Sequence, residues 1–331
     1  MRARLPGWQK VLRYDPLGFI AEYENLALDH LVKRDILGLE EKAGPDRLKE
    51  LSSTPEVARF QRLQRPNGSW KYPGRQATSR ESEDYDLLET YSVLRELIEM
   101  CALDRRVDVV EKACYFILTK QTSDGDIRGI YGNQYSPNYT GGMLELVIKA
   151  GFEDDRRIIK GLEWLLSVRQ DDGGWAIPIR TRKRKYNEVV KAETLETDKT
   201  MPFSHLATGC VLRAFAAHPR YKSCEEALAA GRLLADRFFR PDKYTDRHGP
   251  EYWLRFTFPF WFTDLLSGLD SLSRMGFRPT DLGVKDAVEW FVKKQRPDGG
   301  WRLRMVRGGG DRHLERWTTM AIARALRRLY D

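Results

Sequence analysis

The segment 295–301 reads Gln-Arg-Pro-Asp-Gly-Gly-Trp, and four other segments repeat its pattern in full or in part, beginning at Gln64, Gln121, Arg169 and Phe239. The second copy ends in Ile127 instead of Trp, and the copy at 239–244 keeps only Arg-Pro-Asp and an aromatic residue. Between the Asn or Asp positions, the intervals are 57, 48, 70 and 56 residues. This period suits two helices of about four turns each with their connections, so we predict repeated helix hairpins.

The residue types of this turn have structural explanations. Asp-Gly and Asn-Gly let the chain reverse with a positive φ at little steric cost. The Trp supplies a large apolar plate that covers the end of a hairpin. The Gln can hydrogen-bond backbone groups that lack partners at a helix terminus. We interpret the turn as the joint between repeats and not as a catalytic motif.

Capping residues, apolar residues at helical spacing and closing glycines locate the helices. We predict first helices at about 55–64, 104–121, 154–169, 223–239 and 281–295, and second helices at about 83–101, 138–151, 204–217, 258–275 and 314–330. A helical segment over 16–37 completes or plugs the ring, and strand signals are weak. The expected fold is an all-α, α/α toroid of five to six hairpins. Its expected organisation is one domain over 1–331, with an N-terminal helical segment (1–50), repeats over 51–331 and a charged insertion (179–200).

Composition limits the classes of function. Lys and Arg number 56 against 48 Asp and Glu, a net charge of +8 that mildly attracts anions. Four cysteines lie far apart without a CxxC pair, which is typical of free thiols in a reducing cytoplasm. The N-terminus lacks a signal-like apolar run, and no stretch approaches 18 uninterrupted apolar residues. We therefore expect a cytoplasmic protein and leave contact with a membrane surface open.

The repeated helix ending in Gln-x-x-Asp-Gly-Gly-Trp resembles the repeat of the terpenoid cyclase and protein prenyltransferase superfamily, called the prenyltransferase/squalene oxidase repeat. The likeness runs from about Asp15 to the C-terminus. More narrowly, the chain is similar to stand-alone bacterial and archaeal repeat proteins without an assigned function, through segments 139–144, 151–155, 258–266 and 315–319. The resemblance implies an inner ring of second helices and an outer ring of first helices. It also implies a central funnel that is lined by aromatic side chains and holds an isoprenoid.

The catalytic motifs of this superfamily are incomplete here. Squalene-type cyclases protonate an alkene with the Asp of a D-x-D-D motif, whereas the nearest string here, 83–87, reads Glu-Asp-Tyr-Asp-Leu. Its carboxylates either meet near the funnel mouth, with Asp86 as a candidate acid, or favour the helix N-terminus through its dipole. Protein prenyltransferases bind zinc through Asp-x-Cys and a distant His. No such string exists, and His205 and Cys210 do not share a helical face, so we predict no metal and no cofactor.

Segment 253–264 places six aromatic residues around Pro259, on the predicted fourth inner helix. They either line the funnel for an apolar ligand or pack the inner against the outer ring. Asp264 lies on the same predicted helix as a candidate buried carboxylate, with Arg255 or Arg316 as its partner. Asp86, Asp264 and Tyr139 would also suit a polysaccharide-active α/α barrel, although no spacing demands it.

The insertion carries five positive charges between positions 180 and 185. It either holds a diphosphate or lipid headgroup through Arg182, Lys183 and Arg184, or is simply solvated. Nucleic-acid binding lacks support, since no basic stripe appears elsewhere.

Two hypotheses follow. One is an isoprenoid- or lipid-acting enzyme with its substrate in the funnel and acid chemistry from Asp86 or Asp264. The other is a non-catalytic binding or scaffold protein of the same fold, and a polysaccharide-acting enzyme is a further alternative. The expected partner is an apolar or isoprenoid small molecule in the funnel. The predicted ligand-binding residues are Tyr85, Tyr139, His205, Trp253, Trp261, Arg316 and Trp317.

Overall fold

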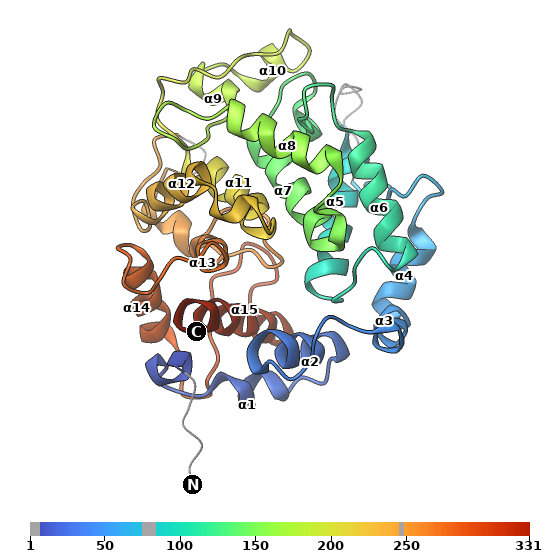
Figure 1. Cartoon of the computed structure of the whole chain (residues 1–331), viewed down its shortest axis with the longest axis vertical. Helices are drawn as coiled ribbons and strands as arrows, with labels where there is room; N and C mark the ends of the chain where they lie inside the picture. The colour runs from blue at the N-terminus through green and yellow to red at the C-terminus, as the bar shows by residue number, and fades with distance from the viewer. Residues whose placement is uncertain (1–6, 75–83, 245–247) are drawn as a thin grey trace.

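The computed structural model describes residues 7–74, 84–244 and 248–331. Its helices form two concentric rings (Figure 1). The inner ring contains α5 (Tyr85–Glu99), α7 (Pro137–Val147), α11 (His205–Ala217), α13 (Leu265–Arg274) and α15 (Arg312–Tyr330). The outer ring contains α4 (Pro55–Leu63), α6 (Asp108–Thr119), α8 (Arg156–Ser167), α12 (Glu225–Ala235) and α14 (Val284–Lys294). Within these described ranges there is no β-strand, only an isolated bridge between Phe256 and Met305. The predicted all-helical toroid is confirmed.

Burial separates the two rings as the hydrophobic pattern requires. The inner helix α11 is buried at every position from His205 to Ala216. The outer helix α8 buries one stripe, made of Ile158, Gly161, Leu162 and Leu165, and exposes its opposite face. A helix that is apolar all round belongs inside a protein, whereas an amphipathic helix covers its surface.

In the first two turns, the Gln joins one repeat to the next. Gln64 Nε2 donates to the carbonyl of Gly68 in its own turn (3.1 Å) and to that of Val109 at the start of α6 (2.9 Å). Gln121 links Gly125 and Arg157 in the same way. The Gln thus bonds backbone carbonyls, as predicted, and its second bond joins neighbouring hairpins.

The Trp of each turn is fixed by its indole and its backbone. In three copies the indole Nε1 donates to the carbonyl ten residues earlier: Trp70 to Phe60, Trp175 to Leu165 and Trp301 to Phe291. The backbone N–H of the same position donates to a Thr hydroxyl on the following inner helix, as from Trp70 to Thr90 (3.1 Å) and from Trp301 to Thr319 (3.3 Å). Buried donors need such partners, and these bonds hold the turn against the helix before it and the helix after it.

The fourth copy departs from the predicted pattern. Tyr244 bonds to the Pro202 carbonyl through its hydroxyl. It is Trp253, farther along the chain, whose indole Nε1 donates to the Arg240 carbonyl (2.9 Å) and which is fully buried. Trp253 therefore takes the structural role of the repeat Trp in this turn.

The predicted fourth inner helix begins too early. Segment 253–264 is not helical, apart from the end of a 3₁₀ turn (Pro250–Leu254), and α13 begins at Leu265. Pro259 has no N–H to donate and its ring clashes with the preceding turn of a helix, so no helix continues through it here. Asp264 then caps α13 by accepting from Ser267 N (2.8 Å). The aromatic segment is thus mainly a loop, which contacts α5 through Trp261 and α15 through Phe258.

The N-terminal segment closes the ring between α15 and α5, through α1 (Pro16–Ala21), α2 (Leu26–Val32), a π-helical turn (Lys33–Leu37) and α3 (Pro45–Ser52). Gln295 of the last turn accepts from the N–H groups of Arg13 and Tyr14 and donates to the Tyr14 carbonyl. The last repeat therefore binds the N-terminal segment with the Gln that elsewhere binds the next repeat.

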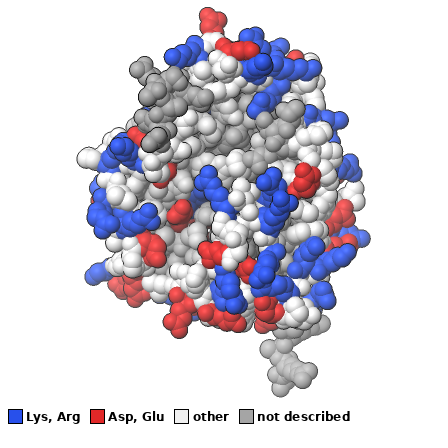
Figure 2. All heavy atoms as spheres, turned by 180° about the vertical axis from the view of Figure 1, so that it is seen from behind, with Lys and Arg blue, Asp and Glu red and all other residues white. Residues whose placement is uncertain are grey.

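The insertion and the surface complete the description. The charged insertion contains two one-turn helices, α9 (Pro178–Thr181) and α10 (Tyr186–Val189). On the face in Figure 2, Lys and Arg side chains are interspersed with Asp and Glu. Over the described residues, no helix has both the length and the apolar character needed to cross a bilayer.

Candidate functional site

The ring interior, meaning the space that the inner helices enclose, has two chemically different ends. Near the N-terminal ends of the inner helices, aromatic side chains pack against one another. The ring centroids of Tyr91 and Trp261 lie 5.0 Å apart, and those of Phe258 and Trp317 lie 6.5 Å apart. We call this the aromatic end, formed by Tyr91, Tyr139, Phe258, Trp261, Phe262 and Trp317.

Near the C-terminal ends of the same helices, the interior holds ion pairs. Asp270 Oδ1 lies 2.8 Å from Arg328 Nη1 and 3.6 Å from Arg324 Nη2, and its Oδ2 lies 2.9 Å from Arg274 Nε. Glu99 pairs with Lys149 (2.5 Å) and with Arg324 (3.5 Å). We call this the ionic end, formed by Asp35, Glu99, Lys149, Asp270, Arg274, Arg324 and Arg328. A cleft of about 600 Å³ opens there.

The charges of the ionic end stabilise one another. Burial alone would raise the pKa of Glu99, but Lys149 and Arg324 outweigh it and lower that pKa to about 2. Burial likewise opposes ionisation of Asp270, yet its arginines hold the pKa of its carboxyl well below the usual value. This network was not predicted from the sequence. The sequence pattern that could have indicated it is a pair of opposite charges four residues apart in an inner-ring segment, as in Glu145 with Lys149 and Asp270 with Arg274.

The two predicted catalytic carboxylates occupy different surroundings. Asp86 pairs with Arg65 (2.6 Å) and accepts from Tyr72 N (2.9 Å), so it ties the first turn to α5. Asp264 is fully buried and accepts from the backbone N–H groups of Ser267 and Thr257. Burial raises the pKa of Asp264 to about 6, although these hydrogen bonds oppose the rise. Glu83 of the same candidate string lies outside the described residues.

Three of the predicted ligand-binding residues take part in packing at the repeat turns. His205 is buried, stacks on Tyr252 and lies 3.6 Å from Asp242 Oδ2. Trp253 holds the fourth turn, and the Tyr85 ring contacts that of Tyr72 at 5.1 Å.

The remaining predicted residues lie at three places. Tyr139 and Trp261 are partly exposed at the aromatic end, and Trp317 is buried there. Arg316 pairs with Glu22 (2.9 Å) and not with Asp264. The predicted anion-binding residues are exposed, Arg182 lying 3.6 Å from Asp198 and Arg184 3.3 Å from Glu188, while Lys183 has a positive φ. Over the described ranges, no group of three His, Cys, Asp or Glu side chains is placed to hold a metal ion.

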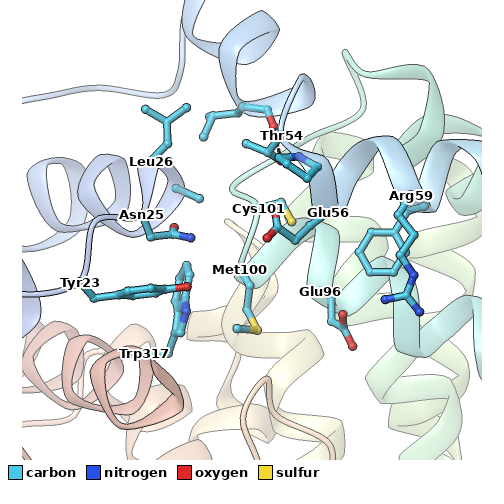
Figure 3. Close-up of a pocket in the computed structure, with 14 residues that line it drawn as sticks. Tyr23, Asn25, Leu26, Thr54, Glu56, Arg59, Glu96, Met100, Cys101 and Trp317 are labelled. Atoms are coloured by element: carbon cyan, nitrogen blue, oxygen red, sulfur yellow. Dashed lines mark hydrogen bonds between the residues drawn. The ribbon is translucent and has the colours of Figure 1, made fainter. Parts of the chain in front are cut away.

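A pocket of about 410 Å³ lies where the N-terminal segment meets α5 (Figure 3). We call it the seam pocket. Four parts of the chain line it: residues at 23–27, at 51–60 and at 96–101, and Trp317 of α15. In Figure 3, Tyr23 and Trp317 stand side by side at one end of the pocket, and Glu96 and Arg59 lie at the other. Trp317 therefore joins the pocket to the aromatic end, where it contacts Phe258.

The walls of the seam pocket are mainly apolar, with a few polar groups. Leu26, Leu51, Phe60 and Met100 contribute carbon and sulfur surface. Asn25 uses its Oδ1 to cap α2 by accepting from Leu28 N, so its amide N–H groups remain available to the pocket. Burial raises the pKa of Glu96, which Arg95 and Arg59 only partly oppose. The oxygens of this carboxyl group are hydrogen-bond acceptors at the edge of an apolar cavity.

Comparisons with known proteins give distant likenesses only. No family model and no curated protein matches the sequence. Among solved structures, a protein from Actinoplanes is 17% identical with a TM-score of 0.46, over 95% of this chain and 88% of its own. A variant of the type II terpene cyclase MstE from Scytonema, with its substrate geranylgeranyl dihydroxybenzoate, is 14% identical with a TM-score of 0.44, over 98% and 97%. Another, with the product merosterolic acid A, is 15% identical with a TM-score of 0.40, over 85% and 97%. At these values the matches assign no residue, ligand or activity to this chain.

Proposed function

We propose that this protein binds a mainly apolar small molecule, of the isoprenoid class, in the seam pocket. The observation that carries the proposal is the pocket itself: about 410 Å³, walled mainly by apolar side chains, in contact with an aromatic ring interior. Small-molecule sites in proteins have volumes of about 300–1,000 Å³, apolar walls and a few placed polar groups.

The polar groups of the pocket fit a ligand with one polar end. The Asn25 amide can donate to a hydroxyl or carbonyl oxygen and the Glu96 carboxylate can accept from a hydroxyl, while Trp317 and Met100 contact a hydrocarbon body. An apolar molecule with one oxygen satisfies both kinds of wall. A sugar fits less well, because burying many hydroxyls against Leu26, Leu51 and Phe60 would leave hydrogen bonds unmade.

Farnesol, an isoprenoid alcohol, is a suitable probe for calorimetric titration. We expect one farnesol per chain, and binding weakened at least tenfold in Met100→Trp, where an indole would fill the cavity. Leu63→Trp is the matched control, because Leu63 is exposed on α4 and does not line the pocket. The control should bind like the native protein.

Two results would contradict the proposal. One is no measurable binding of farnesol to the native chain, which would favour a scaffold role. The other is equal binding by Met100→Trp and the native chain, which would place the ligand elsewhere. Native mass spectrometry of the purified protein would show independently whether a lipid-sized molecule accompanies it.

A further inference from the structure

Arg95 lies inside the ring at the border between its two ends. It follows Tyr91 by one helical turn on α5 and precedes Glu99 by another, so all three face the ring interior. Its side chain is about nine-tenths buried. The guanidinium carbon lies 4.4 Å from the ring centroid of Trp261 and 5.7 Å from that of Tyr91.

Among the described residues, the other cations inside the ring have carboxylate partners. Arg213 Nε lies 2.9 Å from Glu145, and Lys149 bonds both Glu145 and Glu99. Arg274, Arg324 and Arg328 share Asp270. A buried charge is costly unless it is paired in this way.

Arg95 differs from all of them. Among the described residues, no carboxylate oxygen lies within 4 Å of it, and its Nε and Nη1 have no hydrogen-bond partner. Nη2 reaches only Ser92 Oγ, at a long 3.4 Å. Burial lowers the pKa of Arg95 to about 10, with Arg213 acting in the same direction and Tyr91, Glu96 and Glu145 opposing it, which is the direction expected for a desolvated cation.

Nearby acceptors are already in use. Glu145 gives one oxygen to Lys149 and the other to Arg213. The Tyr91 hydroxyl and the Trp261 carbonyl both accept from Arg213 Nη2. These bonds hold Tyr91 and Trp261 in position around Arg95, and among the described residues Nε and Nη1 of Arg95 are left without an acceptor.

From this geometry we infer that Arg95 is an anion subsite, which binds the carboxylate or phosphate of a ligand whose apolar body lies against Trp261. A guanidinium presents parallel N–H groups that match both oxyanions. Trp261 and Ser92, which contact Arg95, are partly exposed, whereas Nε and Nη1 of Arg95 are buried, so a ligand reaches the guanidinium by displacing one of these two side chains. The subsite does not rest on the proposed function, because neither Arg95 nor Trp261 lines the seam pocket.

Titration calorimetry with octyl phosphate, octanoate, 1-octanol and inorganic phosphate tests this inference. We expect the native protein to bind at least one of the two octyl anions at least tenfold more tightly than 1-octanol. Arg95→Met should remove that preference. Arg95→Lys keeps the charge but loses the paired N–H groups of the guanidinium, so its preference for the octyl anions should be intermediate. Arg232→Met, at an exposed position, should behave like the native protein. The octyl anions should also change the fluorescence of the native protein through Trp261, and not that of Arg95→Met.

Each other outcome overturns the inference. Equal anion binding by Arg95→Met would place the anion elsewhere, and absence of binding by the native chain would remove the subsite. Inorganic phosphate binding as tightly as octyl phosphate would show that no apolar body is recognised. Failure of both Arg95 variants to fold would show that the fold itself satisfies the guanidinium.

Discussion

At the ionic end of the ring interior, one carboxylate, Asp270, lies within 4 Å of three guanidinium groups, whereas at the aromatic end Tyr91, Phe258, Trp261 and Trp317 pack ring against ring. The same parallel helices supply both ends. Their C-terminal carbonyls attract cations, which favours Lys149, Arg274 and Arg328 at that end of the ring. The comparison shows that the interior is not uniformly apolar, so an apolar ligand fits the aromatic end and the seam pocket, not the ionic end.

The largest effect should come from removing the central carboxylate. Asp270→Asn leaves the buried Arg324 and the partly buried Arg274 and Arg328 without their shared partner. We expect a loss of about 3–5 kcal/mol in the free energy of unfolding, measured by urea denaturation. Asp236→Asn, on exposed surface after α12, is the control and should change little. A loss in Asp270→Asn no greater than in the control would mean that the ion pairs contribute nothing to stability.

Acid should weaken the ionic end next. The pKa of Glu99 is about 2 in the folded protein against 4.5 in the unfolded chain, and that of Asp270 is also lowered. A lowered pKa gives stability that is complete above pH 4.5 and is lost as pH falls toward 2. We expect the urea midpoint to fall across this window, and to fall less steeply in Glu99→Gln. An equal slope in the variant would assign the acid sensitivity to other groups.

Local, repeated signals allowed the fold to be predicted from sequence. Gln295 and Trp301 make bonds within a few residues of their own turn, so their pattern is visible in the chain itself. The predicted start of α13 at 258 was wrong, because the helix begins only at Leu265. The prediction gave too little weight to Pro259, which disfavours a helix interior. The residue that takes the role of the repeat Trp in that turn was not predicted either, since Trp253 lies beyond the expected spacing.

The sites were harder to predict, since their contacts join distant parts of the chain. Glu99 and Arg324 meet only because the ring closes, and the seam pocket combines Tyr23, Met100 and Trp317. Helical spacing predicts that Tyr91 and Arg95 share a face, but not that Arg95 lacks a carboxylate. Absence of a partner is a property of the whole interior and has no local pattern.

Asp264, beside the aromatic end, should show the opposite pH dependence. Its folded pKa of about 6 exceeds the ordinary aspartate value of 3.8, so its contribution to stability is complete below pH 3.8 and is lost as pH rises through 6. Asp264→Asn should remove this loss. The substitution also replaces one acceptor of the Thr257 N–H, at a cost of about 1–2 kcal/mol that is independent of pH. Urea midpoints between pH 4 and 7 separate the two effects. An unchanged slope in the variant would mean that Asp264 ionises normally.

The smallest effect should come from the partly exposed aromatic ring beside Arg95. Trp261→Leu keeps an apolar side chain, although a smaller one, and removes the ring contact with Tyr91 and the stacking on Arg95. We expect a loss of about 1 kcal/mol in stability, because such contacts are individually weak. Phe262→Leu, on the same loop, is the matched control. If Trp261→Leu cost as much as Asp270→Asn, the aromatic end would be as essential to the ring as the ionic end. A small loss accompanied by weaker binding of the octyl anions would instead assign this ring to ligand recognition and the ion pairs to stability.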